Sequence, residues 1–404
     1  MLMLSIGFLR ASPLLRYAVA PIALLVMTTL VEARAETQPP ELPAEESDVA
    51  ILAAATPHRL FLFEPYGAGG ANVLETDQDP VKVVGLVPTA NNAAISLSRD
   101  AGTVYVADTY WTKGNHGTRQ DMLTVFDGKT LRPLKEIPLP GRLLVVPKLQ
   151  QLSTSDDGKL AYVYDMIPAS AIHVVDLDQG RVETSVDVPG CALAYPYGAR
   201  SFATVCGDGT LGVASVAAEG APTQVVFTKP FFDPDHDPLF ENSIVDRTTG
   251  EGWFLSFTGK VYHVTLGATP VVDKPWSITA AAGMVPAGTG VQELAWRPGG
   301  GQLMALHRPT KRLFVLMHPG NYWTHKAEGS EVWVLDAAKK SLIRRITLPG
   351  PAKGVAVTQD SAPLLYVYGA EGPGGTSLTI LDATTGQIKG GRKIGGMIGL
   401  VPGL

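Results

Sequence analysis

The residues that could do chemistry are densest in one short acidic segment. Asp233-Pro234-Asp235-His236-Asp237-Pro238 holds three carboxylates and an imidazole. Oxygen ligands at that density could bind Ca²⁺. The two prolines and the closeness of the side chains favour a plain acidic loop instead. We therefore predict no metal site here.

Catalytic motifs are missing from the rest of the chain. It contains no G-x-S-x-G, no H-E-x-x-H, no P-loop, and no G-x-G-x-x-G that opens a helix. His307 and His318 follow apolar stretches, where a histidine is more often a structural residue than a ligand or a base. We predict that this chain carries no catalytic residue.

Two aromatic groups allow two interpretations. Tyr322, Trp323, His325 and Lys326 follow a Pro-Gly pair, and Tyr110-Trp111 precedes a Gly-rich loop. Aromatic side chains often anchor protein interfaces, so these residues could line a partner surface. Each loop could equally be folded on its own aromatic side chain. The sequence leaves both possibilities open.

The N-terminus has the pattern of an export signal. Arg10 and Arg16 precede an apolar run at 17–30, and Ala33-Arg34-Ala35 then offers small residues for cleavage. We predict a signal peptide at 1–35, a flexible Pro- and Glu-rich arm at 36–50, and a folded domain at 51–404. The apolar run is short for a membrane span, but an uncleaved anchor is the alternative. After cleavage we expect no membrane insertion and a periplasmic location.

Export bears on the only two cysteines, Cys191 and Cys206. In an oxidising compartment they should form a disulfide, which would stabilise the fold by about 3 kcal/mol. Two buried free thiols are the alternative. The formal net charge is −5 and no basic block occurs, so we expect no nucleic-acid partner.

A repeated unit of 19 residues organises the chain. In each copy an apolar strand ends in Asp, and Gly stands 14 positions later. The pairs are Asp127/Gly141, Asp176/Gly190, Asp336/Gly350 and Asp382/Gly396. We interpret each copy as a hairpin: a strand, a turn opened by the Asp side chain, a second strand, and an exit at positive φ on Gly.

The spacing of the repeats predicts the architecture. Asp127 to Asp176 is 49 residues, and Asp336 to Asp382 is 46. Several short strands in a period of this size are typical of β-propeller blades. Weaker hairpins at 210–226 and 259–272 fill the gap between the repeats. We predict an all-β, seven-bladed propeller of YVTN/WD40-like repeats. A pair of β-sandwiches is the alternative, but it would not produce the long period.

Several segments, in order, resemble one family. They are residues 85–92, 117–127, Cys191 with 206–209, 237–246, 298–308, 314–320 and 324–336. Together they resemble the heavy (large) subunit of the tryptophan tryptophylquinone amine dehydrogenases. The resemblance is closer to the aralkylamine (aromatic amine) branch than to the methylamine branch.

The resemblance implies a function shared between two chains. It implies a periplasmic α₂β₂ heterotetramer in which a small, disulfide-rich subunit carries the tryptophan tryptophylquinone. The heavy chain would hold no cofactor of its own. The reaction implied is oxidation of a primary amine to an aldehyde and ammonia, with electrons passed to a blue copper protein or a cytochrome c.

The resemblance also indicates where this chain would contact the substrate. In the family, a loop matching 88–92 lines the substrate channel. This implies a channel-lining role for Thr89, Ala90, Asn91 and Asn92. Asn91 stands where the aromatic branch has Phe, which puts the substrate preference in question. The same residues could form only a turn and interface loop.

Two other functions are compatible with the residues. One is a periplasmic propeller that acts as a binding or scaffold module without enzyme activity. The other is a propeller hydrolase or lactonase with a central metal ion.

Overall fold

We describe the fold from a computed structural model of the chain. The described residues are 51–64, 66, 69–144, 148–217, 223–371, 375–394 and 399–402. The predicted signal peptide and the predicted arm lie outside them. Within the described ranges, no helix combines the length and the apolar character needed to cross a membrane.

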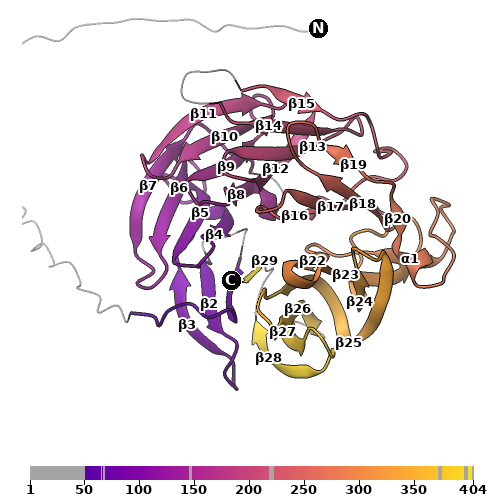
Figure 1. The fold of residues 1–404 in the computed structure, drawn as a ribbon. Coiled ribbons are helices and arrows are strands. Elements are labelled where there is room, and N and C mark those ends of the chain that lie inside the picture. The colour runs from indigo at the N-terminus through magenta and orange to yellow at the C-terminus, as the bar shows by residue number, and fades with distance from the viewer. Residues whose placement is uncertain are drawn as a thin grey trace, which may run out of the picture. The chain divides into compact units, whose positions relative to one another are not determined.

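Antiparallel strands make up nearly all of the regular structure. Their sheets follow one another around a common centre, as the blades of a propeller do (Figure 1). The one α-helix among the described residues is the single-turn α1 (Ile278–Ala281). The prediction of an all-β propeller is confirmed.

Five sheets are separate blades, and each runs outward from an inner strand. The first contains β29 (Gly399–Pro402), β1 (Arg59–Phe63), β2 (Ala71–Glu75) and β3 (Lys82–Val87). The second contains β4 (Asn91–Leu97), β5 (Thr103–Trp111), β6 (Arg119–Asp127) and β7 (Pro133–Leu139). The third contains β8 (Leu152–Thr154), β9 (Leu160–Asp165), β10 (Ala171–Asp176) and β11 (Arg181–Asp187), preceded by the 3₁₀ turn η1 (Leu149–Gln151). The fourth contains β12 (Cys191–Tyr197), β13 (Ser201–Cys206), β14 (Leu211–Ser215) and β15 (Val225–Phe227). The fifth contains β16 (Ile244–Val245), β17 (Glu251–Leu255), β18 (Lys260–Thr265) and β19 (Val271–Val272), and β20 (Trp276–Ser277) also pairs with β18.

The remaining strands form one larger sheet of eight. Its members are β21 (Ala295–Pro298), β22 (Met304–His307), β23 (Arg312–Gly320), β24 (Gly329–Asp336), β25 (Ser341–Val357), β26 (Leu364–Glu371), β27 (Gly375–Asp382) and β28 (Ile388–Ile394), with the 3₁₀ turn η2 (Arg308–Thr310) after β22. The long strand β25 pairs with β24 on one side and with β26 on the other.

The two ends of the folded region meet in the first blade. β29 pairs antiparallel with β1, from Leu60 opposite Pro402 to Phe63 opposite Gly399. The C-terminal strand is therefore the innermost strand of the N-terminal blade. This pairing closes the ring and gives β1 a partner strand on both sides.

The repeated unit forms the hairpins that the sequence predicts. β6–β7, β10–β11, β24–β25 and β27–β28 are antiparallel pairs, each turning just after the repeat Asp. The Asp127 carboxylate accepts hydrogen bonds from the backbone N–H of Lys129 (3.0 Å) and Thr130 (2.6 Å). The Asp382 carboxylate accepts the equivalent pair from Thr384 (2.9 Å) and Thr385 (2.7 Å).

Of the three repeat glycines that the structure describes, only Gly190 takes the predicted positive φ. Gly190 has φ 75°. Gly141 is not at positive φ; it is small because a Cβ there would lie 2.5 Å from a carboxylate oxygen of Asp165. Gly350 lies inside β25, and Gly396 lies outside the described residues. Glycine therefore recurs at the same position of the repeat, but the physical reason for glycine at that position differs from blade to blade.

The weaker hairpins are also present, as β14–β15 and β18–β19. Cys191 and Cys206 form a disulfide between the first residue of β12 and the last residue of β13, which are directly opposite in register. Both cysteines are buried in the hydrophobic cluster that the third, fourth and fifth blades share.

Candidate functional site

The candidate segments 89–92, 110–111, 233–238 and 322–326 lie at one end of the sheets, and His307 lies at the other end, at the turn between β22 and β23. In the second blade, Asn91 on β4 is opposite Thr109 on β5, which is opposite Asp121 on β6. At this end the outer strand β3 leads through residues 88–90 into the inner strand β4. We call the end where one blade connects to the next the connecting end, and the other end of the sheets the turn end.

The predicted channel residues make the first of these connections. Thr89 and Ala90 are buried, and Asn91 and Asn92 are half-buried. The Thr89 hydroxyl accepts a hydrogen bond from the Gly70 N–H at 3.1 Å, and the Asn91 amide donates to the Thr109 carbonyl at 3.3 Å. Only the two asparagines have enough exposure to contact a ligand. Thr89 and Ala90 hold the loop in place.

A buried arginine holds the same loop from behind. Arg142 is 1% exposed, and it donates to the Asn92 carbonyl at 2.5 Å and to the Thr109 hydroxyl at 3.1 Å. The Thr109 hydroxyl in turn donates to Asp121 at 2.6 Å. Burial lowers the pKa of Arg142 to about 10, and Asp121 and then Asp108 oppose this shift. The guanidinium therefore stays charged at neutral pH and ties the loop to the second blade.

Asp108 is the acid that belongs to this cluster. Its carboxylate accepts a hydrogen bond from the Ala90 N–H at 2.7 Å, and the residue is 1% exposed. Burial raises the pKa of Asp108 to about 6, against the hydrogen bond from Ala90 and the charge of Arg142. We call Asp108, Thr109, Asp121 and Arg142 the loop-support cluster.

Sequence reasoning missed the loop-support cluster. Asp108 directly follows the stretch 103–107, which is rich in apolar residues, and Arg142 directly follows a repeat Gly. The sequence thus offered one signal, a charged residue beside an apolar stretch or a repeat Gly. That signal could not show that Asp108 and Arg142 lie close together.

The two aromatic groups have different environments. Tyr110 is 40% exposed beside the loop 112–118. Trp323 is 52% exposed, while His325 stacks on Phe257 with ring centroids 4.1 Å apart. The Tyr322 hydroxyl donates to the His236 carbonyl. The loop at 322–326 is thus folded on its own aromatic rings, and Trp323 is its exposed member.

The acidic segment does not converge on a point. Asp233 accepts hydrogen bonds from the backbone of Asp235 and His236, whereas Asp237 is buried and bonds to Ser256 and Thr258. Asp237 also pairs with Lys260 at 3.0 Å. Within the part of the chain that the structure describes, no group of three or more His, Cys, Asp or Glu side chains could hold a metal ion.

The two histidines take structural partners. His307 bonds to the Thr310 hydroxyl at 2.6 Å and to the Asp360 carbonyl at 3.0 Å. His318 bonds to the Thr324 hydroxyl at 2.8 Å, and burial, followed by the charge of Arg297, lowers its pKa. Each imidazole joins a strand to a neighbouring turn.

A quinone made from two indoles needs two neighbouring tryptophans, and this chain has one such pair among the described residues. Trp296 and Trp333 have ring centroids 5.5 Å apart. The Arg345 guanidinium covers both rings, at 4.5 and 4.8 Å from their centroids, and Trp333 is 0% exposed. Trp296 is half-buried, so the pair packs mainly as part of the core.

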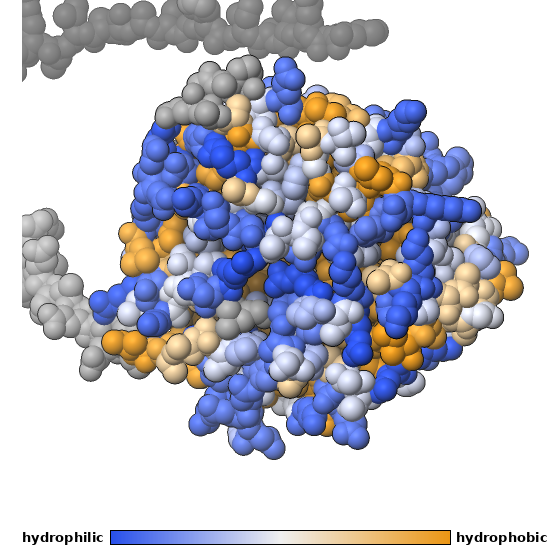
Figure 2. All heavy atoms as spheres, viewed as in Figure 1, coloured by the Kyte–Doolittle hydropathy of each residue, from blue (hydrophilic) through white to orange (hydrophobic). Residues whose placement is uncertain are grey.

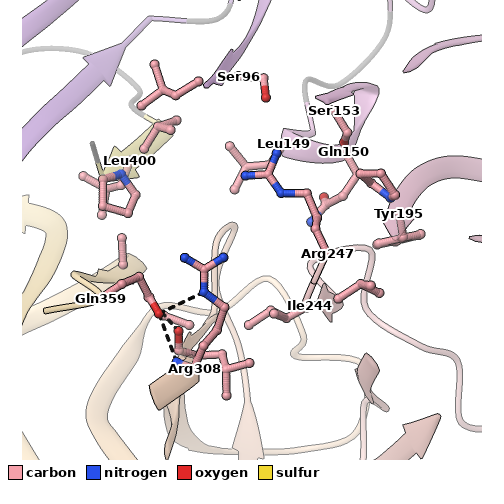
Figure 3. Close-up of a pocket in the computed structure, with 18 of the residues that line it drawn as sticks. Ser96, Leu149, Gln150, Ser153, Tyr195, Ile244, Arg247, Arg308, Gln359 and Leu400 are labelled. Carbon is pink, nitrogen blue, oxygen red and sulfur yellow. Dashed lines mark hydrogen bonds between the residues drawn. The ribbon is translucent and has the colours of Figure 1, made fainter. Parts of the chain in front are cut away.

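A cavity of about 340 Å³ lies along the inner strands, and its lining includes residues of the turns that follow them (Figure 3). Arg247 and Arg308 are among its lining residues, together with the apolar side chains of Leu149, Ile244 and Leu400. This cavity is at the opposite end of β4 from the loop 89–92, because Arg99, which also lines it, follows the last residues of that strand.

Comparison with protein families matches residues 58–397 to the family described as Methylamine dehydrogenase heavy chain (MADH). The methylamine dehydrogenase heavy chain of Methylobacillus flagellatus is 28% identical over 320 residues, which is 79% of this chain and 77% of the relative. The heavy chain of Paracoccus versutus is 29% identical over 348 residues, covering 85% and 79%.

Solved structures of lower identity share the fold. The β-propeller domain of Cps50 (Swd1) from Myceliophteria thermophila has a TM-score of 0.52 at 10% identity, covering 80% of this chain and 96% of that one. The dihydro-heme d1 dehydrogenase NirN has a TM-score of 0.52 at 14% identity, covering 87% and 66%. At these identities the likeness concerns architecture alone.

Proposed function

Since this chain belongs to the methylamine dehydrogenase heavy chain family, we propose that it is the non-catalytic heavy subunit of a periplasmic quinoprotein amine dehydrogenase. The observation that carries the proposal is the family match over 58–397, which spans every strand from β1 to β28.

The proposed partner is a small subunit that bears tryptophan tryptophylquinone. When bound, that group would supply the oxidation of a primary amine to an aldehyde and ammonia. Further parts of the proposal are an α₂β₂ heterotetramer, a blue copper protein or cytochrome c as electron acceptor, and export by the signal peptide at 1–35.

The proposed task of this chain is to position one wall of the substrate channel. Arg142 and Asp108 hold the loop 89–92 by its backbone, through Asn92 and Ala90. A wall held by its backbone leaves the Asn91 and Asn92 side chains free to set the shape of the channel. We propose aralkyl primary amines as substrates on the sequence resemblance, with Asn91 making this part of the wall smaller and more polar than Phe would.

We also propose that the propeller has seven blades. The eight-stranded sheet divides at β25: residues 341–347 pair with β24, and residues 352–357 pair with β26. Counting the two halves as separate blades adds two to the five separate sheets. Division of one long strand between neighbouring blades explains how two blades can share a continuous ladder.

Purification of the native assembly tests the proposed function. The tagged chain is isolated from its own periplasm, and its partners and absorption spectrum are recorded. We expect a small disulfide-rich subunit, a quinone chromophore, and amine-dependent reduction of a dye. The chain expressed alone is the control, and it should be colourless and inactive. A chain that never co-purifies with such a subunit would favour the scaffold function instead.

A further inference from the structure

The central cavity brings together arginines from three different blades. Arg99 follows β4, Arg247 follows β16, and Arg308 begins η2 after β22. Each lies in the turn that leaves an inner strand, so ring closure directs all three to one mouth. Figure 2 shows hydrophilic side chains gathered around the middle of the face in view.

The three arginines differ in their partners. Arg99 is paired with Asp156 at 2.8 Å and is 64% exposed at its side chain. Arg247 donates to the carbonyl (3.1 Å) and the hydroxyl (2.7 Å) of Thr154. The backbone N–H and Nε of Arg308 donate to the Gln359 side-chain oxygen at 3.0 and 3.2 Å.

Arg247 and Arg308 thus have neutral partners. Among the described residues, no carboxylate oxygen forms an ion pair within 4.0 Å of either guanidinium. The nearest acids are otherwise engaged, because Asp156 binds Arg99 and Asp246 accepts the Thr248 N–H at 3.0 Å.

The two guanidinium groups also oppose each other electrostatically. Burial lowers the pKa of Arg247, and the charge of Arg308 lowers it further. The charge of Asp156 raises this pKa, that of Arg99 lowers it, and that of Asp246 raises it. Figure 3 shows the guanidinium groups of Arg247 and Arg308 directed toward the cavity. Two such cations facing one space would be stabilised by an anion between them.

We infer that this cavity is a binding site for a small anion that carries a carboxylate or a phosphate group, held by Arg308 and Arg247. Guanidinium groups bind both of these planar or tetrahedral oxyanions through paired hydrogen bonds. The volume of about 340 Å³ suits a small molecule. Leu149, Ile244 and Leu400 would contact the remainder of an organic acid.

The site is independent of the proposed amine oxidation. It lies at the turn end, whereas the loop 89–92 lies at the connecting end. If no anion binds here, the proposed subunit function is unaffected. If the chain has no quinone-bearing partner, the proposed anion site is equally unaffected.

Calorimetric titration and thermal unfolding test the inference on the full exported chain in its purified assembly. The probes are inorganic phosphate and succinate, each at constant ionic strength against sodium chloride. We expect at least one probe to bind with a Kd of about 1 mM or tighter, and to raise the unfolding temperature. Binding of phosphate alone or of succinate alone identifies the group recognised.

Two variants and a matched control give the test its specificity. Arg308→Gln should weaken binding by about tenfold or more, since it removes a charge-assisted contact. Arg308→Lys keeps the charge and guards against a folding defect; it should also bind more weakly, because it loses the paired geometry. Arg344→Gln, on an exposed arginine of β25 outside the cavity lining, should bind as the parent does. Absence of binding by both probes, or equal binding in the parent and both Arg308 variants, would overturn the site.

Discussion

The two ends of the sheets show two ways in which this protein places an arginine: Arg142 is buried, and Arg308 is half-buried. At the connecting end, Arg142 has Asp121 and Asp108 as its nearest acids and bonds to the loop 89–92. At the turn end, Arg308 bonds to an amide and has Arg247 as a charged neighbour. In the first arrangement, acidic neighbours balance the charge of the arginine. In the second, no negative charge balances it, and this difference separates an arginine that supports the structure from one that could bind an anion.

The largest expected effect is at the connecting end. Arg142→Met should destabilise the fold by about 4 kcal/mol, because it leaves Asp108 without its buried cation and frees the Asn92 carbonyl. Urea unfolding measures the change. Arg99→Met is the control at the other end of the same strand, and it should cost about 1 kcal/mol or less. Similar losses for both variants would remove the distinction between the two ends.

The pH dependence of Asp108 gives the next largest effect. The pKa of this acid is about 6 in the folded protein and about 3.9 when unfolded, so its proton is bound more tightly in the folded state. The unfolded state therefore releases the proton first as pH rises, and stability falls between about pH 4 and pH 6. Asp108 should cost about 3 kcal/mol above that range and nothing below it.

Asp108→Asn isolates this contribution, since the amide oxygen can still accept the Ala90 N–H. The difference in unfolding free energy between the variant and the parent should grow as pH rises from 4 to 7. Asp178→Asn, which makes the same charge change in an exposed turn, should show no such growth. A pH-independent difference at Asp108 would show that its carboxylate is ionised without penalty.

The loop that Arg142 supports should matter more for turnover than for stability. In the assembled enzyme, Asn91→Ala should change kcat/KM for aralkyl amines by about tenfold, equivalent to about 1.4 kcal/mol. Its unfolding free energy should change by less than about 1 kcal/mol, because only one long hydrogen bond is lost. Asn72→Ala, at an exposed position of β2, is the control. Unchanged kinetics for Asn91→Ala would make the loop a turn and interface element only.

The smallest effect has the opposite sign to that of Arg142. At low ionic strength and without phosphate or carboxylates in the buffer, Arg308→Gln should leave stability unchanged or raise it by about 0.5 kcal/mol, because repulsion from Arg247 is relieved. Thermal unfolding in a chloride buffer measures it. A loss of several kcal/mol would place Arg308 in the same structural class as Arg142.

The sequence determined the parts of the fold that depend on near neighbours. Asp127 and Asp382 bond to backbone groups two and three positions ahead, so their hairpins could be predicted from the repeat alone. Cys191 and Cys206 had no competing thiol, so their pairing could be predicted as well. The predicted exit at Gly141 was wrong because its environment is set by Asp165, on a different blade.

Tertiary structure alone decided which distant residues meet. Asp108 and Arg142 come together because one connection crosses between blades, and Arg247 meets Arg308 because the fifth blade packs against the sheet that follows it, with β16 beside β22. Local hydrogen bonds and strand patterns carry no information about such contacts, since their geometry depends on how one blade packs against the next. The sequence by itself therefore determined the blade and the family, and the packing of the blades around their common centre decided where charge is buried, paired or left open.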